Sequence, residues 1–220
     1  MNIGIFGGTF NPIHNAHLRI AEESRDQYDL SSVIFVPAAD PPHKPRHRQL
    51  DFSHRLAMVS LAIKNNPLFT VSSLEGERSG KSYSIDTLRT LHDSYPDDRL
   101  FFIMGSDSFS EIGAWHEYQS IFPLTSIIVV GRPGSVGLCL ASSLPVAIAG
   151  QFCYDVAVNR LTHSSGTSVS YLDGIPLPIS SSSIRELLRC GRSVRYLVPD
   201  GVEHYLKEHT LYARSNPDLP

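Results

Sequence analysis

The sequence is poor in cysteine, and its three cysteines, Cys139, Cys153 and Cys190, are widely spaced and form no CxxC pair. An odd, scattered set of this kind argues against a disulfide framework and against a cysteine-ligated zinc site. Free thiols are typical of a reducing compartment, so we expect a cytoplasmic protein.

The chain also lacks a strong excess of charge, because 19 basic and 22 acidic residues give a formal net charge of -3. A dedicated nucleic-acid-binding protein usually carries a strongly basic face, so we expect no nucleic-acid partner. Long apolar runs are missing as well, and the sequence begins directly with a short apolar stretch. We therefore expect neither a secretory signal nor a membrane-spanning helix.

What the sequence does have is a globular composition, with 41% hydrophobic residues over 220 positions. We expect a single domain spanning residues 1–220. Short apolar runs alternate with segments of helical periodicity, which predicts a doubly wound, Rossmann-like α/β fold with a parallel sheet and helices on both faces. The expected strands are residues 2–6, 33–36, 69–74, 100–104 and 125–130, and the expected helices are 16–28, 53–65 and 83–95.

The second half of the chain has weaker patterns. Residues 134–170 are rich in glycine and serine, and we expect only short strands there, at 146–149 and 169–172. Serines at 180–183 precede an amphipathic segment, which favours a helix with a serine N-cap. A last helix is expected over 199–209, with Pro199 at its first position. Residues 180–209 would form a small helical part, and 215–220 would be frayed.

The turn after the first strand, GGTFNPIHNAHL at residues 7–18, carries the strongest functional signal. Gly7 and Gly8 permit a tight turn and a close backbone approach. A strand that runs into a helix N-terminus offers free N–H groups and a positive dipole end to a phosphate. His14 and His17, three residues apart, can lie on one helix face. Because GxxxxGK[ST] and GxGxxG are both absent, we expect a nucleotide-phosphate site of another type.

Two further segments bring positive charge and hydroxyl groups. Ser180, Ser182 and Arg185 flank a helix N-terminus, where hydroxyls, N–H groups and a guanidinium can converge on phosphate oxygens. The alternative is an N-cap followed by a solvated arginine. His43 and Lys44, on the proline-rich loop 38–49, could meet the same phosphates, while the rest of the basic run HKPRHR is interpreted as solvated.

Two residues suggest how the remaining parts of a nucleotide could be bound. Asp107 follows the fourth expected strand, where doubly wound folds place a carboxylate that accepts hydrogen bonds from ribose, and it could at the same time be a helix N-cap. Trp115, the single tryptophan, could stack on an aromatic ring or simply pack in the core. A metal site is not predicted, because His14 and His17 have no third ligand at suitable spacing.

Seven segments, taken in order, resemble the bacterial nicotinate-nucleotide adenylyltransferases of the HxGH nucleotidyltransferase superfamily. They are His14-Asn15-Ala16-His17, with alanine at the usual glycine, Pro41-Pro42-His43-Lys44, SYSIDTL at 82–88, Gly105-Ser106-Asp107-Ser108, Trp115-His116, Arg132-Pro133-Gly134, and ISSSSIR at 179–185. Asn11 stands where the family commonly has aspartate. The resemblance covers about residues 2–209, with 134–178 matching poorly.

The resemblance implies transfer of AMP from ATP, with Mg2+, to nicotinate mononucleotide. It assigns catalysis to His14, His17, Lys44 and Arg185, and ATP binding to Gly8, Thr9, Phe10, His17, Gly105, Asp107, Ile179, Ser180, Ser182 and Arg185. The pyridine nucleotide would contact Thr9, Lys44, Ser84, Trp115 and His116, with the backbone N–H groups of Ser84 and His116 on the nicotinate carboxylate.

Three alternatives stay open at the level of the sequence. The acceptor could be nicotinamide mononucleotide, phosphopantetheine or FMN. The chain could instead be a non-catalytic nucleotide sensor, or a nucleic-acid-binding module on the same fold. Its oligomeric state, including a homo-oligomer, is also open.

Overall fold

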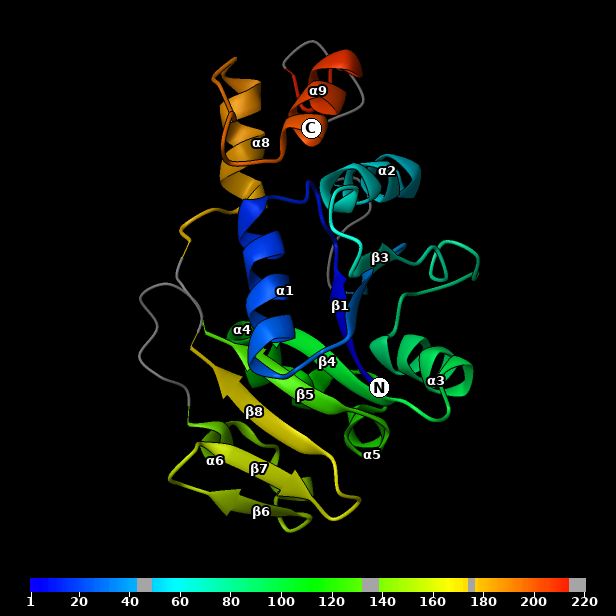
Figure 1. Cartoon of the computed structure of the whole chain (residues 1–220), viewed down its shortest axis with the longest axis vertical. Coiled ribbons are helices and arrows are strands. Elements are labelled where there is room, and N and C mark those ends of the chain that lie inside the picture. Colours follow the sequence, from blue (N-terminus) through cyan, green and yellow to red (C-terminus); the bar gives the residue numbers. More distant parts are fainter. Residues whose placement is uncertain (43–48, 132–138, 174–176, 214–220) are drawn as a thin grey trace. The chain divides into compact units, whose positions relative to one another are not determined.

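The computed structural model describes residues 1–42, 49–131, 139–173 and 177–213 (Figure 1). Eight strands form one sheet in the order β3-β2-β1-β4-β5-β8-β7-β6. The strands are β1 Asn2–Gly8, β2 Ser32–Pro37, β3 Phe69–Val71, β4 Arg99–Gly105, β5 Ser126–Val130, β6 Phe152–Asp155, β7 Arg160–His163 and β8 Ser168–Leu172. The α-helices are α1 Asn15–Gln27, α2 Phe52–Ile63, α3 Ser84–Ser94, α4 Ser106–Ser110, α5 Ile121–Leu124, α6 Leu140–Ser143, α7 Val146–Ala149, α8 Ser181–Arg189 and α9 Asp200–Glu208. This mostly parallel sheet with its helices confirms the predicted α/β fold class.

The central strands are parallel and almost wholly apolar. β1 pairs with β4, β4 with β5 and β5 with β8, all in parallel, with Ile5 opposite Phe102 and Ile103 opposite Ile128. These four side chains are all buried. Continuous apolar runs are expected of parallel strands that are covered on both faces, which is why the sequence located β1, β4 and β5 within one or two residues.

The far edge of the sheet was not predicted correctly. β7 pairs in antiparallel fashion with both β8 and β6, so a hairpin extends the parallel sheet (Figure 1). The strand predicted at 169–172 is confirmed as part of β8, whereas the strand predicted at 146–149 is wrong, because those residues form the one-turn helix α7. Four apolar residues are too few for periodicity to separate a strand from a helix, and only Ile148 of the four is buried.

The chain divides into two compact units, each built from three stretches. Unit 1 comprises Met1–Gly7, Ile20–Val33 and Tyr83–Pro176, and unit 2 comprises Gly8–Arg19, Ile34–Ser82 and Leu177–Pro220. In unit 1, α3 packs against α5 and buries Ile85, Leu88 and Leu91, as its helical periodicity predicted. The single-domain organisation expected from chain length stays a prediction.

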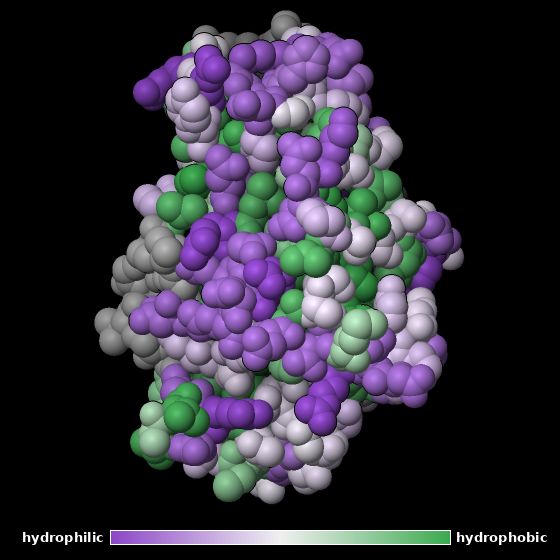
Figure 2. Space-filling model, viewed as in Figure 1, coloured by the Kyte–Doolittle hydropathy of each residue, from purple (hydrophilic) through white to green (hydrophobic). Residues whose placement is uncertain are grey.

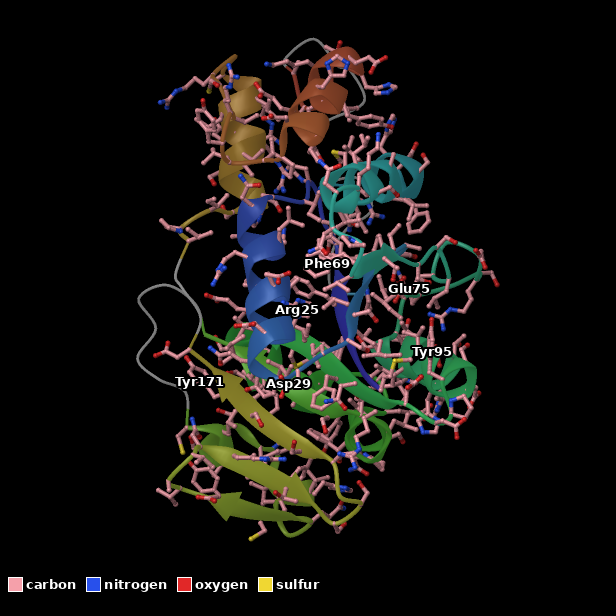
Figure 3. The ribbon with its side chains drawn as sticks, viewed as in Figure 1. Arg25, Asp29, Phe69, Glu75, Tyr95 and Tyr171 are labelled. Atoms are coloured by element: carbon pink, nitrogen blue, oxygen red, sulfur yellow. The ribbon has the colours of Figure 1, made fainter. Side chains whose placement is uncertain are left out.

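Unit 2 contains α2, β3, α8 and α9. Helix α2 packs against both α9 and β3, and the ring of Phe69 on β3 lies 5.3 Å from that of Phe35 (Figure 3). Most of the side chains in view over α8 and α9 are hydrophilic (Figure 2). The last helix begins one residue later than predicted, so Pro199 is its N-cap rather than its first residue. The predicted fraying of 215–220 falls outside the described residues.

Within the described ranges, every helix is too short or too polar to cross a membrane.

Candidate active site

The glycine turn of unit 2 is held in one conformation by an aromatic ring. Phe10 has a left-handed backbone with φ of 46°, and its side chain is 2% exposed. A Cβ atom on Gly8 would lie only 3.0 to 3.3 Å from atoms of this ring. Glycine is therefore needed at position 8 because of the close approach of Phe10. The ring also meets His17 edge-on, with centroids 5.1 Å apart.

The two histidines of the turn lie together, as their spacing predicted. Helix α1 starts at Asn15, directly after His14, and the two imidazole rings stack with centroids 3.7 Å apart and planes inclined by 23°. The backbone N–H of His14 donates to Nδ1 of His17 at 3.2 Å. Since Nδ1 accepts, the proton of the neutral His17 ring is on Nε2, which makes Nε2 a hydrogen-bond donor.

The serine-led helix α8 contacts the same corner of unit 2. Nη1 of Arg185 donates to the carbonyl of Asn11 at 2.8 Å, and Oγ of Ser181 donates to the carbonyl of Pro12 at 2.9 Å. Nη2 of Arg185 also donates to Oγ of Ser182 at 3.2 Å. Two segments about 170 residues apart in the sequence are thus joined directly. Partial burial lowers the pKa of Arg185, yet a guanidinium remains charged at physiological pH.

Ser180 has the structural role that the sequence offered as an alternative. Its Oγ accepts the backbone N–H of Ser183 at 3.1 Å, and the Ser183 side chain reaches back to Ser180 in a capping box. Ser180 is therefore the N-cap of α8. Ser182 lies one residue into the helix and is exposed. Ile179 precedes the cap, and its N–H donates to the carbonyl of Leu177 at 2.7 Å.

A buried polar network behind this corner was not predicted from the sequence. Oδ1 of Asn11 accepts both the N–H of Leu50, at 3.2 Å, and the hydroxyl of Tyr212. Tyr212 is 2% exposed, and burial raises the pKa of its phenol well above its ordinary value, so the hydroxyl stays protonated as a donor. The arginine Arg55, on α2, is also buried, at 1% exposure. A signal for Arg55 did exist, because it lies three and four residues before the buried Met58 and Val59 and so shares their helix face.

The residues expected to bind the pyridine ring lie in unit 1. Trp115 is partly exposed and meets Phe102 edge-on, with ring centroids 6.3 Å apart, so it is not simply a core residue. The ring of His116 lies 4.3 Å from that of Tyr83, and its Nε2 lies 3.4 Å from Oε1 of Glu117. Ser84 is the first residue of α3, where backbone N–H groups have no acceptor within the helix.

Gly105 and Asp107 follow the central strand β4, also in unit 1. Gly105 is the last residue of β4 and the N-cap of α4, and Asp107 is exposed in the first turn of that helix. The carboxylate therefore lies just past the carboxyl end of a parallel strand, as predicted. The alternative reading of Asp107 as an N-cap is wrong.

Several expected residues lie outside the described part of the chain. His43 and Lys44 belong to residues 43–48, and the Arg132-Pro133-Gly134 motif to residues 132–138. Among the residues that are described, no three His, Cys, Asp or Glu side chains are grouped as metal ligands would be.

Comparison with known proteins places this chain among nucleotidyltransferases. Residues 5–187 match the family described as Cytidylyltransferase-like. The chain is 62% identical over 212 residues to a "Probable nicotinate-nucleotide adenylyltransferase" of Citrifermentans bemidjiense, covering 96% of this chain and 98% of the relative. A relative of the same name from Geotalea uraniireducens is also 62% identical, with the same coverage. The chain belongs to the cytidylyltransferase-like family and, within it, to the nicotinate-nucleotide adenylyltransferases.

The fold agrees with this assignment. The structure of Plasmodium falciparum nicotinic acid mononucleotide adenylyltransferase complexed with NaAD is similar to that of this chain, with a TM-score of 0.71 and 21% sequence identity. The match covers 96% of this chain and 97% of the other. The family and the enzyme class predicted from the seven motifs are therefore confirmed.

Proposed function

We propose that the protein transfers AMP from ATP to nicotinate mononucleotide, yielding nicotinate adenine dinucleotide and pyrophosphate. The observation that carries the proposal is the contact of Arg185 with the carbonyl of Asn11, three residues before the first motif histidine. Through it, the histidine corner and the N-terminus of α8 lie side by side in unit 2. The names of the close relatives support the same activity.

The reaction needs positioning and charge neutralisation more than acid–base chemistry. An oxygen of the acceptor 5′-phosphate attacks the α-phosphorus of ATP and forms a new P–O bond, while the bond from that phosphorus to the oxygen that bridges the α- and β-phosphates breaks and releases pyrophosphate. The nucleophile is already an anion, so no general base and no covalent enzyme intermediate are required. Donors aimed at the developing negative charge supply the stabilisation.

The phosphate-binding roles fall to residues of unit 2. His17 donates from Nε2 to phosphate oxygens of ATP, with His14 stacked on it. Arg185 neutralises the outer phosphates, with Ser182, Ser180 and Ile179 at the start of its helix. Lys44 is assigned to the same phosphates on the basis of its sequence motif. The backbone groups of Gly8, Thr9 and Phe10 contact ATP next to these side chains. ATP enters as its Mg2+ complex, in which phosphate oxygens and water ligate the ion.

The recognition roles fall to residues of unit 1. Trp115 stacks on the pyridine ring through its partly exposed indole. The backbone N–H groups of Ser84 and His116 donate hydrogen bonds to the nicotinate carboxylate. The NH2 of a nicotinamide could not accept these bonds, because it is itself a donor. Asp107, next to Gly105, accepts from the ribose hydroxyls of the adenosine.

The test is a panel of acceptors with one readout. Purified protein is incubated with ATP and Mg2+ and with nicotinate mononucleotide, nicotinamide mononucleotide, phosphopantetheine or FMN, and pyrophosphate release is measured. We expect fast release with nicotinate mononucleotide and a kcat/KM at least tenfold lower with the others. Faster turnover with another acceptor would assign the site to that substrate, and ATP binding without pyrophosphate release would indicate a nucleotide sensor. Chelation of Mg2+ should abolish release.

A further inference from the structure

The guanidinium of the buried Arg55 donates hydrogen bonds to backbone carbonyls. Its Nε donates to Leu50 at 2.9 Å, and Nη1 donates to Thr9 at 2.9 Å and to Ala38 at 2.6 Å. Nη2 donates to Ala39 at 3.3 Å. Four of the five N–H groups of a guanidinium are thus engaged with the chain itself, all within unit 2.

These carbonyls come from three separate segments. Thr9 belongs to the glycine turn, Ala38 and Ala39 follow β2, and Leu50 lies two residues before α2. Residues 38–39 and 50 flank, on its two sides, the stretch that contains Lys44. A single side chain therefore fixes the turn of the proposed phosphate site and both flanks of the stretch with its lysine. A lysine at position 55 could not do so, because its ammonium is a point donor rather than a planar fork.

The Ala39 peptide is also held from its other side. Its N–H donates to Oγ of Ser82 at 3.0 Å and to Oε2 of the buried Glu75, which is labelled in Figure 3, at 3.3 Å. Burial lowers the pKa of Arg55, while the nearby Glu75 and Asp51 favour its charged guanidinium. A charge placed in such surroundings is costly unless it is well hydrogen-bonded, and here the bonds to carbonyls supply that compensation.

We propose that Arg55 is a positioning residue for adenylyl transfer: by fixing the carbonyls of Thr9, Ala38, Ala39 and Leu50, it holds the phosphate-binding backbone in its reactive geometry without touching substrate. The proposal rests on the proposed function, because the geometry matters through that reaction. Misplacement of reacting groups by about 1 Å can cost roughly 100-fold in rate, which sets the expected size of the effect.

A neighbouring pocket makes a chemical rescue experiment feasible. It has a volume of about 530 Å³. Ala39, Leu50 and Arg55 are among the residues that line it. Because Arg55 forms part of the wall, its removal opens a path by which a guanidinium ion from solution can reach the four carbonyls.

The experiment compares Arg55→Ala and Arg55→Lys with the wild type. We expect kcat/KM for ATP to fall about 100-fold in Arg55→Ala and at least tenfold in Arg55→Lys, because neither side chain can bridge the three segments. Guanidinium chloride at about 20 mM, well below denaturing concentrations, should restore at least tenfold of the loss in Arg55→Ala, whereas urea should not. Arg25→Ala is the matched control, because Arg25 donates to Glu22 on the same helix, α1, and to none of the four carbonyls that Arg55 binds.

A second readout does not depend on activity. Loss of Arg55 should speed hydrogen exchange of the backbone amides of Ala39 and Leu50 at least fivefold, because their surroundings then open more often, and guanidinium should reverse this. Failure of the wild type to form pyrophosphate would refute the proposed function alone, since the exchange rates would still report on Arg55. If Arg55→Ala does not fold, Arg55→Lys decides. Activity within threefold of wild type, or a loss of activity with unchanged exchange, would refute the positioning role.

Discussion

Unit 2 and unit 1 present their candidate residues in contrasting ways. In unit 2, Arg185, Tyr212 and Arg55 reach the histidine corner through hydrogen bonds to backbone carbonyls or to a buried amide. In unit 1, Trp115 and His116 are partly or largely exposed and rest on the rings of neighbouring aromatic residues. One set is fixed by directional polar bonds and the other by ring packing.

The contrast follows from the chemistry assigned to each set. Charge that develops on a phosphate is stabilised only by donors already in place, so a buried and fully bonded frame is useful there. An aromatic ring is recognised mainly by its face, and stacking tolerates small displacements. We therefore expect changes in unit 2 to affect turnover and changes in unit 1 to affect acceptor affinity.

The largest expected effect is on His17. His17→Ala removes the Nε2 donor and should lower kcat by about 10²–10³, the range seen when one preorganised transition-state donor is lost. Steady-state kinetics with saturating substrates measures this directly. His204→Ala is the control, since that side chain is 82% exposed on α9 and should leave kcat unchanged. Near wild-type turnover of His17→Ala would remove this residue from the mechanism.

A smaller effect, on a different constant, is expected at Trp115. Trp115→Ala should raise KM for nicotinate mononucleotide about three- to tenfold, in line with the loss of one stacking interaction, and leave KM for ATP nearly unchanged. The two constants are measured by varying each substrate in turn. Tyr154→Ala, on the edge strand β6, is the control for an aromatic side chain elsewhere in unit 1. Equal changes in both constants would contradict the stacking role.

The smallest effect is expected from the buried phenol. Tyr212→Phe removes the hydroxyl that donates to Asn11 and should lower the free energy of unfolding by about 1 kcal/mol, because the N–H of Leu50 still satisfies that oxygen. Thermal unfolding should show Tm lower by about 2–4 °C. In Tyr205→Phe, the lost bond is the part-buried one to His54, so the shift should be smaller. An equal Tm shift in both variants would mean that burial of the Tyr212 hydrogen bond does not increase its contribution to stability.

The accuracy of the sequence-based predictions depended on how strong each local pattern was. β4 and α3 were located closely, since a continuous apolar run marks β4 and a clear helical period marks α3. β8 was located within one residue on a weaker pattern, because serine separates Val169 from Tyr171 and Leu172. The hairpin of β6 and β7 was missed because its strands are short, partly exposed and rich in polar residues. Helix α7 was predicted as a strand because four apolar residues fit both periods equally well.

For the candidate site, residue types and spacings were sufficient to recognise the chemistry. The glycine turn, the paired histidines and the serine-led helix each follow from short-range rules of backbone conformation and helix termini, and their order along the chain was sufficient to predict the family. The partners of Arg55, Arg185 and Tyr212 were beyond such rules. Those hydrogen bonds join residues from 5 to 201 positions apart and end mostly on backbone carbonyls, which every residue type carries. Only the folded chain selects one carbonyl among so many, because the choice depends on which segments pack together.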